Sequence, residues 1–220
     1  MTGVAVSFEG SIMALAMFML ANSITPGPNN LMLLHGGIKR GFWQCRWHML
    51  GITTGVTIML WLSYWGMAAL VVGYPALMLT IKTLGTLYLL WLTYQMAKSD
   101  FTAIIQEALQ REQSGATNVK QRFGELPFNF WQAVLFQWLN PKAWTMTVVA
   151  PSIAMFHTSK PWLDNYSLLA LCAAVNIVSI SFWAAGGHWL RKLVHLPSVM
   201  RVIHAVIVIM TLYCALTIWI

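Results

Sequence analysis

Six long apolar stretches make up most of this chain. A helix that crosses the hydrocarbon core of a bilayer needs about 20 consecutive apolar residues. With that length as a guide, we expect membrane spans at 8–38, 49–72, 76–96, 128–156, 165–187 and 202–220. Because 58% of the residues are hydrophobic and only 9% are charged, a water-soluble domain is excluded. The sequence therefore predicts an all-α polytopic membrane protein with six transmembrane helices.

The basic residues are concentrated in three of the connections between these spans. The ten residues concerned are Lys39, Arg40, Arg46, Lys98, Arg111, Lys120, Arg122, Arg191, Lys192 and Arg201. They form no run interleaved with stacking aromatic residues, so we expect no nucleic-acid partner. Under the positive-inside rule, the three basic connections face the cytoplasm and both termini face outward. Because the first ten residues contain Glu9 and no Lys or Arg, we expect the first stretch to be a span rather than a removable export signal.

Two of the stretches, 8–38 and 128–156, are too long for one straight crossing and contain helix breakers near the middle. The first reads Thr25-Pro26-Gly27-Pro28-Asn29-Asn30, and the second contains Asn140-Pro141-Lys142 with Gln137 one turn earlier. Proline cannot donate a backbone hydrogen bond, and opened backbone inside a membrane must face protein or a water-filled cavity. We therefore predict discontinuous helices 1 and 4, with a simple structural kink as the alternative, and expect the other four spans to be continuous.

A polar segment at about 97–127 separates the spans into two groups of three. Apolar residues within it recur at helical spacing, at Phe101, Ile104, Ile105, Ala108 and Leu109. We expect an amphipathic helix on the cytoplasmic leaflet, and a gate or partner-docking helix is the alternative. The segment then joins a first repeat at about 8–96 to a second at about 128–220. An odd number of spans in each half makes the halves opposite in orientation, so the sequence predicts one transporter domain, 1–220, built from two inverted three-helix repeats.

Candidate substrate-binding residues gather at the two predicted breaks. They are Thr25, Pro26, Gly27, Pro28, Asn29, Asn30, Gln137, Asn140, Pro141 and Lys142, with Asn176 on the fifth span. The half-helix after Pro28 would present free N–H groups and a positive dipole end to a carboxylate. Lys142 lies near mid-bilayer and must face the bundle or a wet cavity; substrate contact and a structural contact with freed carbonyls are equal alternatives. For Asn176, bonding to a neighbouring helix is the alternative to lining a path.

Two further residues are secondary candidates. Lys82 lies about two turns from the outer end of its span, so snorkelling to the outer interface is slightly favoured over a cavity-lining role. His35 follows the first break by one to two turns. A hydrogen-bonded helix histidine is the favoured interpretation there, and a titrating group is the alternative.

Five of the six acidic residues lie outside the predicted spans, and the sixth, Glu9, lies at the outer edge of the first. This argues against a carboxylate proton relay, a divalent-metal site and a hydrolase centre in the membrane, so we expect no catalytic residue, metal or cofactor. Cys45, Cys172 and Cys214 are far apart and suggest packing residues rather than a disulfide or metal site. The alternative function, a membrane-embedded scaffold or enzyme acting on a lipid or peptide bond, lacks a nucleophile and base pair in the spans. The expected partners are the lipid bilayer and a small molecule, and homo-oligomer formation stays open.

Three segments together resemble the LysE/RhtB family of amino-acid exporters over nearly the whole chain. They are Thr25-Pro26-Gly27-Pro28-Asn29, the element from Lys82 to Tyr88, and Asn140-Pro141-Lys142-Ala143. The resemblance implies secondary active export of small amino acids or derivatives, such as threonine, homoserine, lysine, cysteine or O-acetylserine, driven by the proton motive force. It also implies a location in the bacterial cytoplasmic (inner) membrane, where termini that face outward under the positive-inside rule are periplasmic. Because no span supplies an acid for a second positive charge, we expect a substrate without net positive charge.

The predicted orientation is testable with reporter fusions. Alkaline phosphatase fused after Ile220 should be active in the periplasm, because the basic connections hold the other side of the protein in the cytoplasm. The same reporter fused after Lys98 serves as the control and should stay inactive. A cytoplasmic C-terminus would mean that a re-entrant segment has been counted as a crossing.

Overall fold

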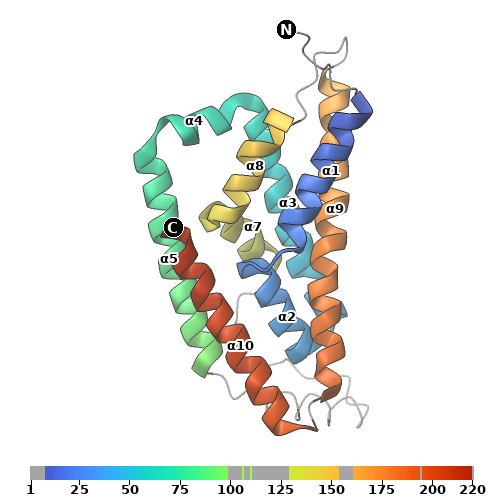
Figure 1. Cartoon of the computed structure of the whole chain (residues 1–220), viewed down its shortest axis with the longest axis vertical. Helices are drawn as coiled ribbons and strands as arrows, with labels where there is room; N and C mark the ends of the chain where they lie inside the picture. The colour runs from blue at the N-terminus through green and yellow to red at the C-terminus, as the bar shows by residue number, and fades with distance from the viewer. Residues whose placement is uncertain are drawn as a thin grey trace.

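The computed structural model describes residues 8–98, 129–153, 161–193 and 195–219, together with positions 106 and 110. Every regular element within these residues is helical (Figure 1). The α-helices are α1 (Phe8–Ile24), α2 (Pro28–Arg40), α3 (Arg46–Leu62), α4 (Ala68–Gly73), α5 (Pro75–Lys98), α7 (Phe130–Leu139), α8 (Pro141–Ile153), α9 (Pro161–Leu190) and α10 (Pro197–Leu216). Short 3₁₀ turns lie at Trp43–Cys45, Arg191–Leu193 and Thr217–Trp219. The predicted amphipathic helix lies outside the described residues, apart from the two isolated positions.

Four helical segments are long and apolar enough to cross a bilayer. They are Trp43–Gly73, Pro75–Lys98, Tyr166–Leu193 and Pro197–Trp219. The first and fourth predicted spans are instead broken, into α1 and α2 and into α7 and α8. The all-α fold and its membrane-crossing helices are thus confirmed, whereas the six-span inverted repeat stays a prediction.

The second predicted span is not continuous, so that part of the prediction is wrong. After α3, a π-helical turn at Ser63–Met67 leads into α4. Gly66 within this turn has φ 98°, a left-handed backbone conformation that favours glycine. The bend carries α4 across one end of the bundle to α5 (Figure 1).

Glycines allow three close helix contacts that fix the bundle. Gly51 and Gly55 form a GxxxG pair on α3 that contacts α7. A Cβ at Gly51 would meet the Phe130 carbonyl oxygen, and one at Gly55 would lie 2.6 Å from Cγ of Gln137. Gly37 and Gly187 form an equivalent contact between α2 and α9. On α5, a Cβ at Gly85 would meet the carbonyl oxygen of Leu139, at the end of α7. Each contact works because glycine has no side chain, which lets two backbones approach.

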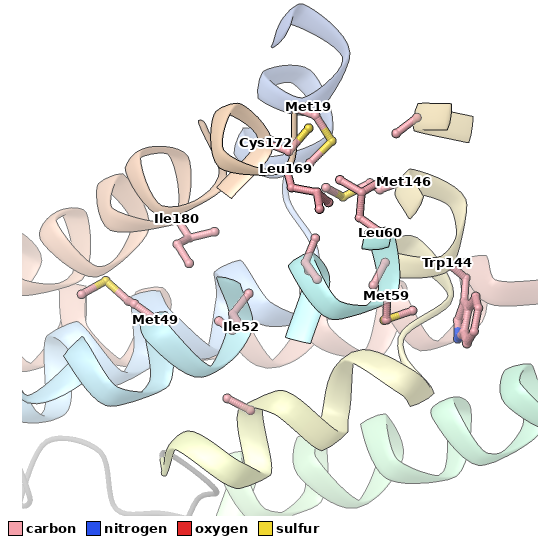
Figure 2. Packing of buried hydrophobic residues seen from close by; sticks show 14 of the residues in the cluster. Met19, Met49, Ile52, Met59, Leu60, Trp144, Met146, Leu169, Cys172 and Ile180 are labelled. Carbon is pink, nitrogen blue, oxygen red and sulfur yellow. The ribbon is translucent and has the colours of Figure 1, made fainter. Parts of the chain in front are cut away.

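The apolar core lies between α1, α3, α8 and α9, next to the two helix breaks. Figure 2 shows Met19 of α1, Met59 of α3, Met146 of α8 and Cys172 of α9 among the side chains that fill it. Cys45 and Cys172 are both buried free thiols, which confirms packing roles for them. Helices α5 and α10 pack against each other as a pair (Figure 1), and a second apolar cluster joins them to α2 and α7. This pair forms the wall opposite α1 and α8.

Replacement of Gly51 by alanine should destabilise the protein. The added methyl group would overlap the Phe130 carbonyl and force α3 and α7 apart, at a cost of about 1–3 kcal/mol. Gly73→Ala is the matched control, because the Cβ position of Gly73 has open space around it. Thermal unfolding in detergent should show a lower midpoint for Gly51→Ala and an equal or slightly higher one for the control. Equal midpoints for both variants would contradict the α3–α7 contact.

Candidate functional site

Side-chain hydrogen bonds stabilise the first helix break. Helix α1 ends at Ile24 and α2 begins at Pro28, with Gly27 extended at φ −170° and ψ 173°. The Asn30 side-chain amide donates to the Ser23 carbonyl at 2.8 Å and to the Thr25 carbonyl at 2.7 Å. Among the residues that the structure describes, no side chain caps the start of α2. Its first backbone N–H groups therefore form an uncapped, electropositive helix end, as the sequence predicts.

The second break differs because its helix start is capped. Helix α7 ends at Leu139 and α8 begins at Pro141. The side-chain oxygen of Asn140 accepts a hydrogen bond from the backbone N–H of Lys142 at 3.2 Å. The indole N–H of Trp144 donates to the Trp138 carbonyl at 2.9 Å, which satisfies an acceptor left near the break. An anion would find fewer free donors here than at the start of α2.

An amide pair joins the two breaks. The Asn29 side-chain N–H donates to Gln137 Oε1 at 2.8 Å, and Gln137 Nε2 returns a hydrogen bond to Asn29 Oδ1 at 3.2 Å. Gln137 is fully buried and also donates to the Ala133 carbonyl at 2.8 Å. These residues are 108 positions apart in the chain, so the fold brings the two predicted segments together.

Lys142 binds the C-terminal end of α1. Its ammonium donates to the Thr25 carbonyl at 2.9 Å, to the Thr25 hydroxyl at 2.9 Å and to the Pro26 carbonyl at 3.3 Å. The C-terminal end of a helix carries partial negative charge, so a cation is favourable there. A Cβ at Gly27 would lie 3.1 Å from Lys142 Nζ, so the lysine fits because Gly27 has no side chain. The structure thus shows the structural contact, and substrate contact by Lys142 stays a prediction.

Helix α9 contributes two further polar links to the site. The Asn176 amide N–H donates to the Ser23 hydroxyl at 3.0 Å, and its oxygen accepts from the Thr53 hydroxyl at 3.0 Å. Asn176 therefore joins α1, α3 and α9 and also lines the inner cavity, whereas its predicted contact with substrate stays a prediction. Trp183 donates from its indole N–H to the Ile24 carbonyl at 3.0 Å, where α1 ends.

Two cavities adjoin the place where the two helix breaks meet, which we call the junction. The inner cavity has a volume of about 20 Å³, and its polar lining consists of Asn22, Ser23, Asn29, Asn30, Gln137, Asn140, Lys142 and Asn176. That volume suits about one water molecule. The outer cavity has a volume of about 420 Å³ and lies between α1, α5, α8 and α10; Asn140 and Lys142 line both cavities. The Lys142–Thr25 contact lies where the two cavities adjoin.

The two secondary candidates, Lys82 and His35, lie in different surroundings from each other. Half-buried Lys82 lines the outer cavity together with Lys142, although the sequence slightly favoured snorkelling. His35 is fully buried and lines neither cavity. Its ring centroid lies 6.2 Å from that of His204 on α10.

Several lining residues were missed by the sequence analysis. Asn22 and Ser23 are polar residues directly before the first break, a signal that could have identified them. Thr145, Cys214 and Thr217 line the outer cavity. No local pattern indicates these three, because they become neighbours only when α8 and α10 pack around α5.

The sequence that forms this site matches one known family of membrane proteins. A family profile described as LysE type translocator matches residues 20–220. The chain belongs to this family. Similar curated proteins include the cysteine/O-acetylserine efflux proteins of Escherichia coli O157:H7, Escherichia coli strain K12 and Shigella flexneri serotype 5b (strain 8401). Each is 25% identical over 204 residues, which cover 92% of this chain and 94% of the relative.

Both helix breaks belong to the part of the chain that is shared with this translocator family. Both breaks, at 25–27 and at Asn140, lie inside the region that the LysE-type profile matches. The resemblance based on these segments is confirmed, and the chain is a translocator rather than a member of an enzyme family. No solved structure matches the chain significantly.

The Asn29–Gln137 pair should show energetic coupling in a double-mutant cycle. Loss of either amide leaves a buried partner unsatisfied, so Asn29→Ala and Gln137→Ala together should cost less than the sum of the single effects. We expect a coupling energy of about 0.5–3 kcal/mol from unfolding in detergent. Asn22→Ala with Gln137→Ala is the control pair, because Asn22 bonds to Phe18 within its own helix. Additive effects for Asn29 and Gln137 would contradict the pairing.

Proposed function

We propose that this LysE-type translocator exports small amino acids or close derivatives from the bacterial cytoplasm, with cysteine and O-acetylserine as the first candidates. The observation that carries the proposal is the polar junction of two broken helices within a chain that matches a translocator family. Discontinuous helices at membrane depth commonly form the substrate sites of secondary transporters. The printed names of the curated relatives, cysteine/O-acetylserine efflux protein, support this substrate class.

The carboxylate of the substrate would bind at the start of α2. The backbone N–H groups that follow Gly27 have no side-chain cap, and the helix dipole makes this end positive. The Lys142 ammonium lies beside Gly27 and adds a full positive charge. This combination favours an anion without any metal ion.

The ammonium of the substrate would bind to neutral oxygens. Asn29, Gln137 and Asn140 line the inner cavity and carry amide oxygens. Within the described ranges, no acidic side chain lines either cavity. A second positive charge would therefore lack a partner, which favours neutral side chains such as those of cysteine, O-acetylserine, threonine and homoserine.

Transport requires the junction to open. An inner cavity of about 20 Å³ cannot hold an amino acid, whereas the outer cavity of about 420 Å³ can. We assign the outer cavity to the periplasmic side, because the basic ends of α2, α5 and α9 lie at the other end of the bundle (Figure 1). Movement of the two inverted halves, driven by the proton motive force, would break and reform the Asn29–Gln137 and Lys142–Thr25 contacts.

Substitution of Lys142 should lower export. Lys142→Ala removes a charged hydrogen-bond donor, so we expect a loss of about tenfold to a hundredfold in the export rate. Lys142→Arg should restore only part of the rate, because a planar guanidinium fits poorly beside Gly27. Counterflow of radiolabelled O-acetylserine in proteoliposomes measures the rate.

Two controls separate a transport defect from a folding defect. Lys192→Ala changes a basic residue at the opposite end of the bundle and should retain export. Thermal unfolding of Lys142→Ala in detergent shows whether the variant is folded before transport is compared. Wild-type rates for a folded Lys142→Ala, or faster efflux of lysine and arginine than of neutral amino acids from dipeptide-loaded cells, would overturn the proposal.

A further inference from the structure

The outer cavity is unusual in the charge of its walls. Lys82 of α5 and Lys142 of α8 both line it, together with Asn140, Thr145, Cys214 and Thr217. Within the residues that the structure describes, no aspartate or glutamate contributes to this lining. The cavity therefore has two positive charges, neutral polar groups and no compensating carboxylate.

The two lysines have different hydrogen bonding. Lys142 directs its donors at the end of α1, where carbonyl and hydroxyl oxygens offset part of its charge. By contrast, no residue in the described part of the chain accepts a hydrogen bond from the Lys82 ammonium or forms an ion pair with it. Lys82 is nevertheless half-buried in a membrane-spanning helix. A positive charge without a partner is costly at membrane depth, and a bound anion would offset that cost.

The cavity has the size and position of a binding site on the exit path. Its volume of about 420 Å³ falls within the range of about 300–1,000 Å³ of small-molecule sites. It shares Asn140 and Lys142 with the inner cavity, so a ligand that leaves the inner site enters it directly. Lys82 lies seven residues after Pro75, about 10 Å along α5, between the break and the end of the bundle.

We infer that the outer cavity is a second, anion-binding subsite in which Lys82 holds the carboxylate of a departing amino acid. The identity of that ligand rests on the proposed function, whereas the preference for anions follows from the cavity alone. In this arrangement the carboxylate passes from the start of α2 to Lys82 as the amino acid moves outward. Lys82 thus gives the exit path a preference for carboxylates over bare ammonium compounds.

A native cysteine allows the charge preference to be measured without transport. Cys214 lines the cavity and is half-buried, whereas Cys45 and Cys172 are 1% and 2% exposed. In full-length protein in detergent, we would compare modification by the anionic reagent 2-sulfonatoethyl methanethiosulfonate and by the cationic 2-(trimethylammonium)ethyl methanethiosulfonate. Each rate is divided by that of a free thiol. The normalised ratio should favour the anionic reagent, and Lys82→Gln should reduce it several-fold, because one of the two positive charges that line the cavity is removed.

Matched variants control for indirect effects. Lys98→Gln removes a lysine at the other end of the same helix and should leave the ratio unchanged. Cys214→Ser should abolish the labelling. If Cys214 is unreactive, Thr217→Cys in the Cys214→Ser background repeats the comparison at an exposed position of the same cavity. A ratio that does not favour the anionic reagent, or that is the same in Lys82→Gln and wild type, overturns the inference.

Protection experiments test the ligand separately. O-Acetylserine and acetate should slow modification of wild-type Cys214 in a saturable way, and several-fold less in Lys82→Gln. Ethanolamine, which has an ammonium group but no carboxylate, should give no protection. Protection by acetate but not by O-acetylserine would support the anion subsite and count against the amino-acid substrate of the proposed function. Protection by ethanolamine alone would overturn the subsite even if counterflow of O-acetylserine succeeds.

Discussion

The structure depends on the hydrogen bonds that the backbone carbonyls receive where α1 ends. Each unpaired carbonyl or N–H inside a membrane costs several kcal/mol, so a broken helix persists only if other groups replace its lost hydrogen bonds. Asn30, Lys142 and Trp183 supply donors to the carbonyls of residues 23–26. These donors come from α2, α8 and α9. The packing of three separate helices is therefore tied to one short break.

The helix ends at the two breaks differ in how many of their backbone groups have hydrogen-bond partners, and this difference makes the junction electropositive. Donors from side chains cover the end of α1, and Asn140 caps the start of α8. The start of α2 alone among these ends lacks a side-chain cap in the described residues. The start of α2 therefore keeps a positive electrostatic potential next to Lys142. Lys82 adds a second positive charge in the adjoining outer cavity. An anion could follow a continuous path of favourable potential from the middle of the bundle outward.

Much of this arrangement could be predicted because proline and glycine act locally. Pro26, Pro28 and Pro141 interrupt helices wherever they fold, so both breaks follow from the sequence. The contact at Gly51 and Gly55 was also predictable, although its partner was not, because small residues show that another backbone approaches and not which one. The direction of Lys82 and the dual role of Asn176 depend on which helices pack beside them. The bend at Gly66 could not be predicted from the sequence, because glycine within an apolar helix is also common at packing contacts. Only its φ angle in the structure identifies the bend.

The attachment of α5 has a mechanical consequence. Its beginning is joined to α3 through α4 and the bend at Gly66, whereas its middle contacts the carbonyl of Leu139 at Gly85. A helix that is held at its middle can tilt about that point. Lys82 lies only one turn from Gly85 and would move little during such a tilt. Such a tilt would change the width of the cavity rim while the distance between Lys82 and Lys142 stays nearly constant.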